Sequence, residues 1–242
     1  MLIGGFILTG ADPKKIIIRA IGPSLTKNGV PGALGDPTLE LYDSGGHFLG
    51  SNDNWKESQE NDIVATGVAL SDPLESAILT TLNANAGYTA IVRGKNGSIG
   101  VGLVEVYDLS LGANSKLANI STRGYVDTGD NVMIGGFIVG GSNQDRTNVV
   151  IRAIGPSLTT AGISNALQDP TLSVYDKNGS VIGTNDNWRD AQQPEVVANG
   201  LAPTDDRESA LYESLPPGNY TAVVRGKDNK TGVALVEVYN LQ

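Results

Sequence analysis

The chain contains one sequence twice, and this duplication is the feature that most constrains its fold. The segment IGGFILTG at Ile3 recurs as IGGFIVGG at Ile134, and IRAIGPSLT occurs at both Ile18 and Ile151. The later matches keep the offset between 131 and 133 residues. Solenoid repeats have periods of roughly 20 to 50 residues, so each copy is predicted to be a whole domain with its own core.

The two copies are not equivalent at their starts. We predict a first domain over residues 1–110 and a second over residues 111–242, which begins with a linker and an extra strand at 117–126. Copy one begins at Met1, which aligns with Val132. The sequence therefore predicts that the first domain lacks the strand that opens the second.

Within each copy the apolar runs are short, rich in β-branched residues and separated by turn residues, which is the pattern of strands. In copy two the predicted strands are 132–139, 149–154, 172–175, 181–183, 210–215, 220–225 and 233–239. One helical turn is expected at 192–199, matched by 59–66 in copy one. Seven or eight strands in each copy predict an all-β protein made of two tandem jelly-roll-like β-sandwich domains.

The composition argues against several classes of function. With 17 basic and 26 acidic residues, the net charge of −9 repels a nucleic-acid backbone. No apolar run is long enough to span a bilayer, so we expect no membrane insertion. The chain has no cysteine and one histidine, His47, in a predicted turn, which leaves no Ser-His-Asp triad and no zinc site. A carboxylate pair of the glycosidase type stays open, and we predict a protein that is not an enzyme.

A polar cluster ending in tryptophan occurs in both copies. Asn and Asp oxygens spaced closely in a loop are ligands that calcium prefers, and Glu75 or Glu208 is placed to complete such a shell. The alternative, favoured because no glycine-bounded calcium loop is present, is a tight turn in which these side chains bond their own backbone. The candidate ligands are Asn52, Asp53, Asn54, Asn185, Asp186 and Asn187.

Trp55 and Trp188, the only tryptophans, end these clusters. An exposed indole ring stacks on sugars, whereas a buried one packs on the core of a sandwich. The sequence leaves both interpretations open, with core packing the more common of the two.

Charged residues also recur on three strands. The period of two places Arg19 on the strand face opposite Ile16 and Ile18. If the three strands are neighbours, their outer faces carry a ladder of charges that stabilises a solvated sheet; the alternative is a surface for an anionic ligand. The ladder residues are Arg19, Arg93 and Glu105, repeated as Arg152, Arg225 and Glu237.

These motifs resemble a known group of domains. The run DPTLxxYDxxGxxxGxNDNW, followed by ESA, a Tyr-Thr-Ala strand and the LVEVY strand, is similar to C-terminal repeat modules of large secreted bacterial proteins, which are related in pattern to the bacterial pre-peptidase C-terminal (PPC) β-sandwich domains. The resemblance implies an eight-stranded jelly roll, a location outside the bacterial cell and an accessory role in adhesion or surface display. It also implies that calcium or carbohydrate, where bound, falls on Asn52, Asp53, Asn185 and Asp186.

The sequence thus predicts a non-catalytic extracellular structural or adhesion module, a segment or subunit of a surface array or filament that associates by strand complementation. Its expected partners are other copies of the module or a neighbouring surface protein. The alternative is a carbohydrate-binding module, with or without calcium, whose partner is a polysaccharide.

Overall fold

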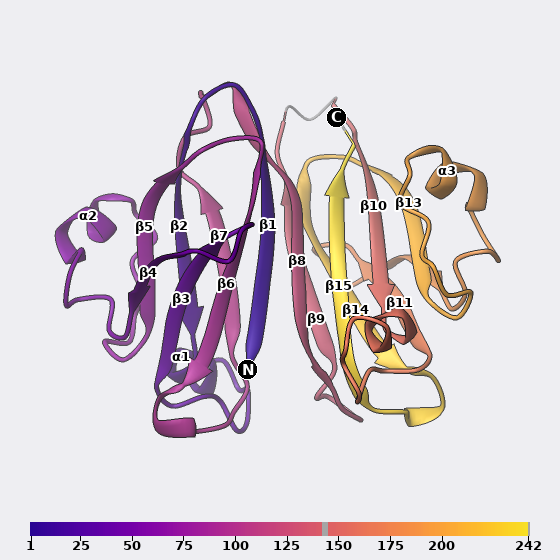
Figure 1. Ribbon diagram of the computed structural model, residues 1–242, viewed down its shortest axis with the longest axis horizontal. Coiled ribbons are helices and arrows are strands. Elements are labelled where there is room, and N and C mark those ends of the chain that lie inside the picture. Colours follow the sequence, from indigo (N-terminus) through magenta and orange to yellow (C-terminus); the bar gives the residue numbers. More distant parts are fainter. Residues whose placement is uncertain (142–144, 242) are drawn as a thin grey trace. The chain divides into compact units, whose positions relative to one another are not determined.

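The computed structural model describes residues 1–141 and 145–241 and consists of two compact units, residues 1–118 and 119–242 (Figure 1). The first residues of strand β8 (Ser115–Val126) belong to unit 1, and just before them the carbonyl of Asn114 accepts a hydrogen bond from the amide of Ala11 at 2.7 Å. The division between the units thus lies inside the predicted linker strand, eight residues beyond the predicted boundary at 110.

Unit 1 contains seven complete strands and two short α-helices. Its elements are β1 (Leu2–Gly10), β2 (Lys14–Ile21), α1 (Pro23–Lys27), β3 (Pro37–Asp43), β4 (Phe48–Asn52), α2 (Glu60–Ala65), β5 (Ser76–Leu82), β6 (Ala86–Gly94), a 3-10 turn η1 (Lys95–Gly97) and β7 (Leu103–Asp108). One layer has the order β1-β6-β3-β4 and the other β5-β2-β7, with antiparallel pairing.

Unit 2 repeats these elements and begins with one more strand. Its elements are β8 (Ser115–Val126), β9 (Met133–Val139), β10 (Thr147–Ile154), η2 (Pro156–Thr159), β11 (Pro170–Tyr175), β12 (Val181–Asn185), α3 (Gln193–Ala198), β13 (Ser209–Leu215), β14 (Gly218–Gly226), η3 (Lys227–Asn229) and β15 (Gly232–Asn240). The layers are β9-β14-β11-β12 and β8-β15-β10-β13. This is the strand order of a jelly roll, in which the first strand pairs with the last.

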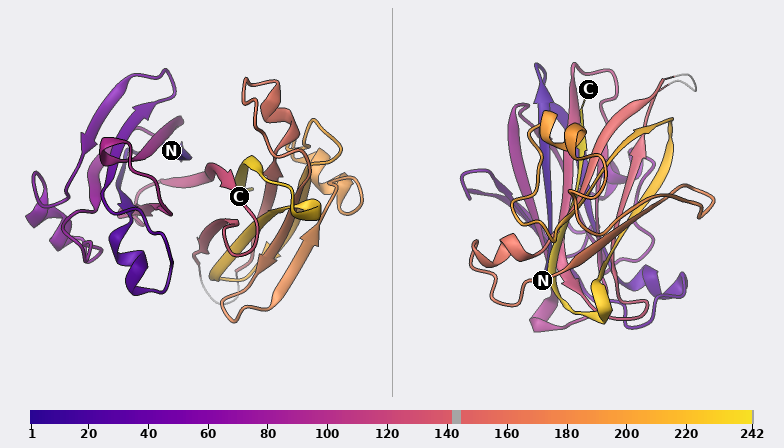
Figure 2. Two further views of the ribbon diagram at one scale, coloured as in Figure 1. Left: turned by 90° about the horizontal axis from the view of Figure 1, so that it is seen from below. Right: turned by 90° about the vertical axis from the view of Figure 1, so that its right-hand side faces the viewer.

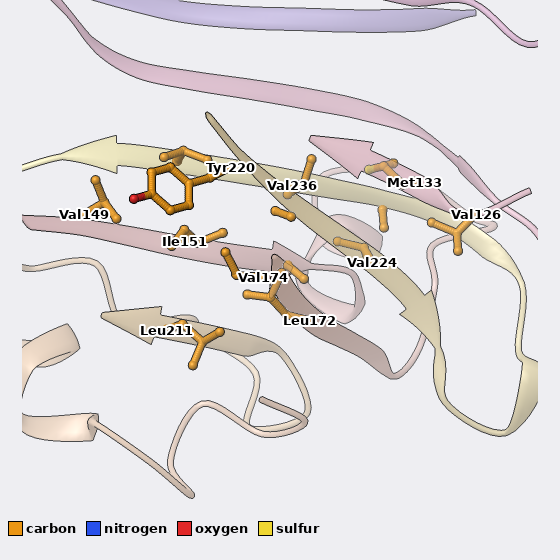
Figure 3. Close-up of a cluster of buried hydrophobic side chains, with 14 of the residues drawn as sticks. Val126, Met133, Val149, Ile151, Leu172, Val174, Leu211, Tyr220, Val224 and Val236 are labelled. Atoms are coloured by element: carbon orange, nitrogen blue, oxygen red, sulfur yellow. The ribbon is translucent and has the colours of Figure 1, made fainter. Parts of the chain in front are cut away.

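The strand alternation builds the core of each unit. In unit 2, alternate residues of facing strands, such as Ile151, Leu172 and Val224, form one buried cluster between the layers (Figure 3). The corresponding cluster of unit 1 includes Ile16 and Ile18, which the period of two assigns to the same face. The all-β sandwich prediction is confirmed, and the strand layers are seen from two further directions in Figure 2.

A second apolar cluster lies on the outer face of the layer that contains β2. Ile17 and Ile21 on β2 are buried there against Trp55 and Ile63, which come from the segment between β4 and β5. The equivalent segment of unit 2 buries Trp188 and Val196 against Ala210. The outer face of this layer is therefore covered by protein over β2 and β5, which corrects the expectation of a solvated sheet.

Candidate functional site

The duplicated Asn residues before each tryptophan cap an open strand edge. Asn52 accepts a hydrogen bond on Oδ1 from the amide of Ala77 in β5 at 2.9 Å and donates from Nδ2 to the carbonyl of Asn54 at 3.1 Å. Asn185 makes the same two bonds, at 2.9 and 3.0 Å, with Ala210 and Asn187. The amide oxygens therefore satisfy backbone, as in the turn interpretation.

The neighbouring aspartates are paired with lysine. Lys95 Nζ lies 2.5 Å from Asp53 Oδ2, and this hydrogen bond raises the pKa of Lys95. In unit 2, Lys227 Nζ lies 2.6 Å from Asp186 Oδ2 with the same effect on its pKa. An ammonium group thus neutralises each of these carboxylates through its Oδ2 atom.

The remaining candidate ligands also have protein partners. Asn54 Nδ2 donates to Glu57 Oε1 at 2.7 Å, and Asn187 Nδ2 donates to Asp190 Oδ2 at 2.9 Å. Within residues 1–141 and 145–241, no three Asp, Glu or His side chains gather in an arrangement that would hold a metal ion. These hydrogen bonds are those of the tight turn. Among the described residues, Asp53 Oδ1, Asn54 Oδ1 and Asp186 Oδ1 are buried without a hydrogen-bond partner, so the calcium hypothesis stays a prediction.

Each acidic residue expected to complete a calcium shell binds a turn through one carboxylate oxygen, while Glu75 Oε2 and Glu208 Oε2 are buried with no hydrogen-bond partner among the described residues. Glu208 is fully buried, and its Oε1 accepts hydrogen bonds from the amides of Gly155 and Ser157 at 3.0 and 2.9 Å and from the Ser157 hydroxyl at 2.5 Å. Glu75 makes the same contacts with Gly22 and Ser24 in unit 1. The sequence offers one signal of this contact, because Gly-Pro-Ser and Glu-Ser-Ala are both repeated, but it does not show that the two segments meet.

Both tryptophan rings are buried. Trp55 is 4% exposed and Trp188 is 2% exposed. Lys56 Nζ lies 5.0 Å from the centre of the Trp55 ring, and the Arg189 guanidinium lies 4.2 Å from that of Trp188. Neither ring presents a free face to a sugar, so the glycan-stacking hypothesis is corrected: these indoles pack the outer apolar clusters.

The predicted charge ladder separates into two parts. Arg19 on β2 is opposite Glu105 on β7, with Arg19 Nη2 2.5 Å from Glu105 Oε2, and Arg152 and Glu237 repeat this pair at 2.5 Å. The third guanidinium nitrogen is also used, since Arg19 Nη1 donates to the carbonyl of Val68 at 2.6 Å. The guanidinium charge is satisfied inside the unit and does not form a surface for anions.

Arg93 and Arg225 lie on β6 and β14, in the other layer, so the single three-strand ladder is wrong. A period of two assigns a residue to a strand face but does not say in which sheet the strand lies. Arg93 pairs instead with Glu40 of β3 at 2.5 Å, and the position of Glu40 is taken in copy two by Ser173.

Ser173, which replaces Glu40 in copy two, lines a shallow polar depression of about 310 Å³ in unit 2. Its lining includes Ser173 on β11 and Thr184 on β12, together with Asp186 and Asp190 from the loop that follows. Arg225 is opposite Thr171 in the strand register, next to this depression.

The last strand of each unit shows the largest difference between the copies. β15 pairs with β10 on one side and with β8 on the other. β7 pairs with β2, and among the described residues it is the end strand of its layer. Unit 1 therefore has the jelly-roll layer β5-β2-β7 without the strand that β8 supplies in unit 2.

The side chains of β7 are more exposed than their counterparts on β15. Val236 and Val238 of β15 are 2% and 8% exposed, whereas their counterparts Val104 and Val106 are only partly buried. On the outer face, Val101 and Leu103 are 40% and 39% exposed, and Ile99 beside them is 95% exposed. Their counterparts Val233 and Leu235 pack against a buried cluster. Burial also raises the pKa of Tyr239 on β15 to about 12.

The backbone of β7 presents its free groups on alternate residues. Val101 and Leu109 donate their amides on the β2 side, to the carbonyls of Gly32 and Lys15. Because strand residues alternate in direction, the odd-numbered residues of β7 bond β2 and the even-numbered ones face the open edge. Gly102, Val104 and Val106 therefore direct N–H and C=O groups outward, as Val236 and Val238 direct theirs to β8.

The opposite edge of the same layer is capped by side chains. Gln59 donates from Nε2 to the carbonyl of Leu79 at 2.8 Å and accepts the Leu79 amide on Oε1 at 3.0 Å. With Asn52 on Ala77, these amides satisfy the edge of β5. The edge of β7 is thus the candidate functional site, an unpaired strand edge flanked by exposed apolar side chains.

Comparisons with known proteins find similar solved structures but no family. No protein family model matches the chain, and no curated protein matches it. One solved structure with some similarity is that of the STIV MCP, a viral major capsid protein, at 13% identity over 99% of this chain and 91% of that chain, with a TM-score of 0.26. At this TM-score the similarity does not bear on function.

Replacing the buried glutamate tests its structural role. Glu208→Ala leaves two amides and a hydroxyl without their acceptor, and we expect the free energy of unfolding to fall by about 3 kcal/mol. Urea denaturation followed by tryptophan fluorescence measures the change. Glu195→Ala, at an exposed position of α3, is the matched control and should change stability by less than about 0.5 kcal/mol. Equal effects of the two variants would contradict the assigned role.

Hydrogen exchange tests the open edge. The amides of Val104 and Val106 face no strand, so we expect them to exchange at least about tenfold faster than those of Leu103 and Glu105, which bond β2. NMR-detected exchange resolves the individual amides. In β15 the corresponding alternation should be absent, because both sides are paired. Slow exchange at Val104 and Val106 in the free protein would show that the edge is covered.

Proposed function

We propose that the chain is a non-catalytic structural or adhesion module of the bacterial cell surface, a segment of an array or filament in which modules associate by strand complementation. The observation that carries the proposal is the unpaired edge of β7, where an incoming strand would find free backbone groups and exposed apolar side chains. The partners are other copies of the module or a neighbouring surface protein.

The chemistry of the polar motifs supports a structural role. The duplicated Asn residues cap a strand edge, Glu75 and Glu208 hold turns, and the Arg-Glu pairs join strands. These three kinds of contact occur in both copies and lie inside each unit, as expected for residues that hold a sandwich together. The extracellular location rests on the sequence resemblance described above.

The test is association through the β7 edge. We expect sedimentation velocity to show oligomers whose proportion rises with protein concentration. Leu103→Lys places a charge on the exposed face beside the edge and should weaken association at least about tenfold, because charged side chains protect strand edges. Val64→Lys, at an exposed apolar position of α2, is the control and should leave association unchanged. A monomer at all concentrations, or equal effects of the two variants, would contradict the proposal.

A carbohydrate-binding module is the second candidate. The observation that favours it is the polar depression of unit 2, where Ser173, Thr184 and Asp190 offer hydroxyl and carboxylate groups to a sugar. In unit 1, Glu40 and Arg93 form an ion pair at the equivalent place.

We expect Ser173→Glu to pair with Arg225, as Glu40 pairs with Arg93, and to weaken glycan binding at least about tenfold. A glycan array identifies which glycan binds. Reading the array with calcium and again with a chelator measures any calcium dependence. Glu213→Gln, in the same unit but outside the depression, is the control. No binding by the unmodified chain, or undiminished binding by Ser173→Glu, would rule out this candidate.

A further inference from the structure

We infer that the β7 edge is an acceptor for one kind of strand, an antiparallel segment with the side-chain pattern of β8. This inference rests on the proposed function and specifies its partner. It is carried by the equivalence of the two units, because unit 2 contains the occupied form of the site that unit 1 leaves open.

The direction and register of the partner follow from the pairing in unit 2. β8 runs antiparallel to β15, with Ile120 opposite Val238, Thr122 opposite Val236 and Gly124 opposite Ala234. The copies are offset by 132 residues in this strand, since Gly102 matches Ala234. An incoming strand in the same register places its Ile120-type residue opposite Val106 and its Thr122-type residue opposite Val104.

The inward face of the partner is set by the core it covers. In β8 the inward positions are Ile120, Thr122, Gly124 and Val126, and Val126 is fully buried in the core of unit 2. The partner therefore needs branched apolar residues at the first and last of these positions. Gly102 in β7 is smaller than its counterpart Ala234, so the position of Gly124 accepts a small side chain such as alanine in a partner of unit 1.

The outward face of the partner is more apolar than that of β8. In unit 2, Tyr125 of β8 is opposite Val233, and its hydroxyl lies 3.1 Å from Thr231 Oγ1. The counterpart of Thr231 in unit 1 is Ile99, which is 95% exposed. A polar contact in unit 2 thus becomes an apolar one, and an aromatic or aliphatic residue at this position of the partner covers Ile99 and Val101.

The test uses a synthetic peptide of residues 115–126 and the full chain labelled with ¹⁵N. We expect binding to slow exchange of the Gly102, Val104 and Val106 amides at least about tenfold and to leave the Val236 and Val238 amides unchanged, since β8 already bonds them. A spin label at the peptide's N-terminus should broaden Asp108 more than Gly100, as antiparallel pairing requires. A peptide with Ile120→Lys and Val126→Lys should lose binding at least about tenfold.

The outcomes separate this inference from the proposed function. Chemical-shift changes in β15 in place of β7 would mean that the peptide replaces β8 in unit 2, and they would overturn the inference. Spin-label broadening that is strongest at Gly100 would overturn it as well. Oligomers that weaken with Leu103→Lys while the peptide fails to protect β7 overturn the inference and leave the proposed function standing. A monomer that also fails to bind the peptide overturns both.

Discussion

The pairing of the last strand of each repeat is the interaction on which both units depend. In unit 2 this strand, β15, lies between β8 and β10, and its alternate side chains enter the core. Each backbone group within such a central strand is bonded on one side or the other, so the strand is fixed in register. The Arg152–Glu237 pair adds a charge-assisted contact to β10 on the outer face, where the segment before β13 covers it.

In unit 1 the last strand, β7, pairs on one side only, with β2. Arg19 and Glu105 hold β7 to β2 with the same geometry, so the strand is positioned without a neighbour on its other side. The consequence is local, since the inner cluster of unit 1 still contains Phe6, Leu8 and Leu39 in fully or almost fully buried form. A seven-stranded sandwich is thus compact while it leaves one edge unpaired.

The sequence predicted the elements well because their signals are local. Alternation identified the strands. Except for β8, each strand occurs again in the other copy, as do the two helical turns that became α2 and α3. The site residues were harder, because their partners lie far along the chain. Glu75 bonds Ser24 across 51 positions, and the sheet that holds Arg93 depends on the path of the whole chain. Trp55 shows the same limit, since burial of its ring depends on Ile63 and Leu70, which a local turn pattern does not place.

The edges of β5, β4 and β7 in unit 1 differ in how they are protected from pairing with another strand. Where β5 ends its layer, the chain places Gln59 and Asn52 side chains on the exposed amides. β4, at the end of the other layer, is five residues long and has an irregular register against β3. Short strands, irregularities and capping groups are the devices that keep strand edges from pairing with other chains. β7 has apolar residues beside its edge in place of these devices, and the repeated sequence preserves the rest of its pairing. An edge left in this state next to two protected ones is consistent with a site that receives a strand.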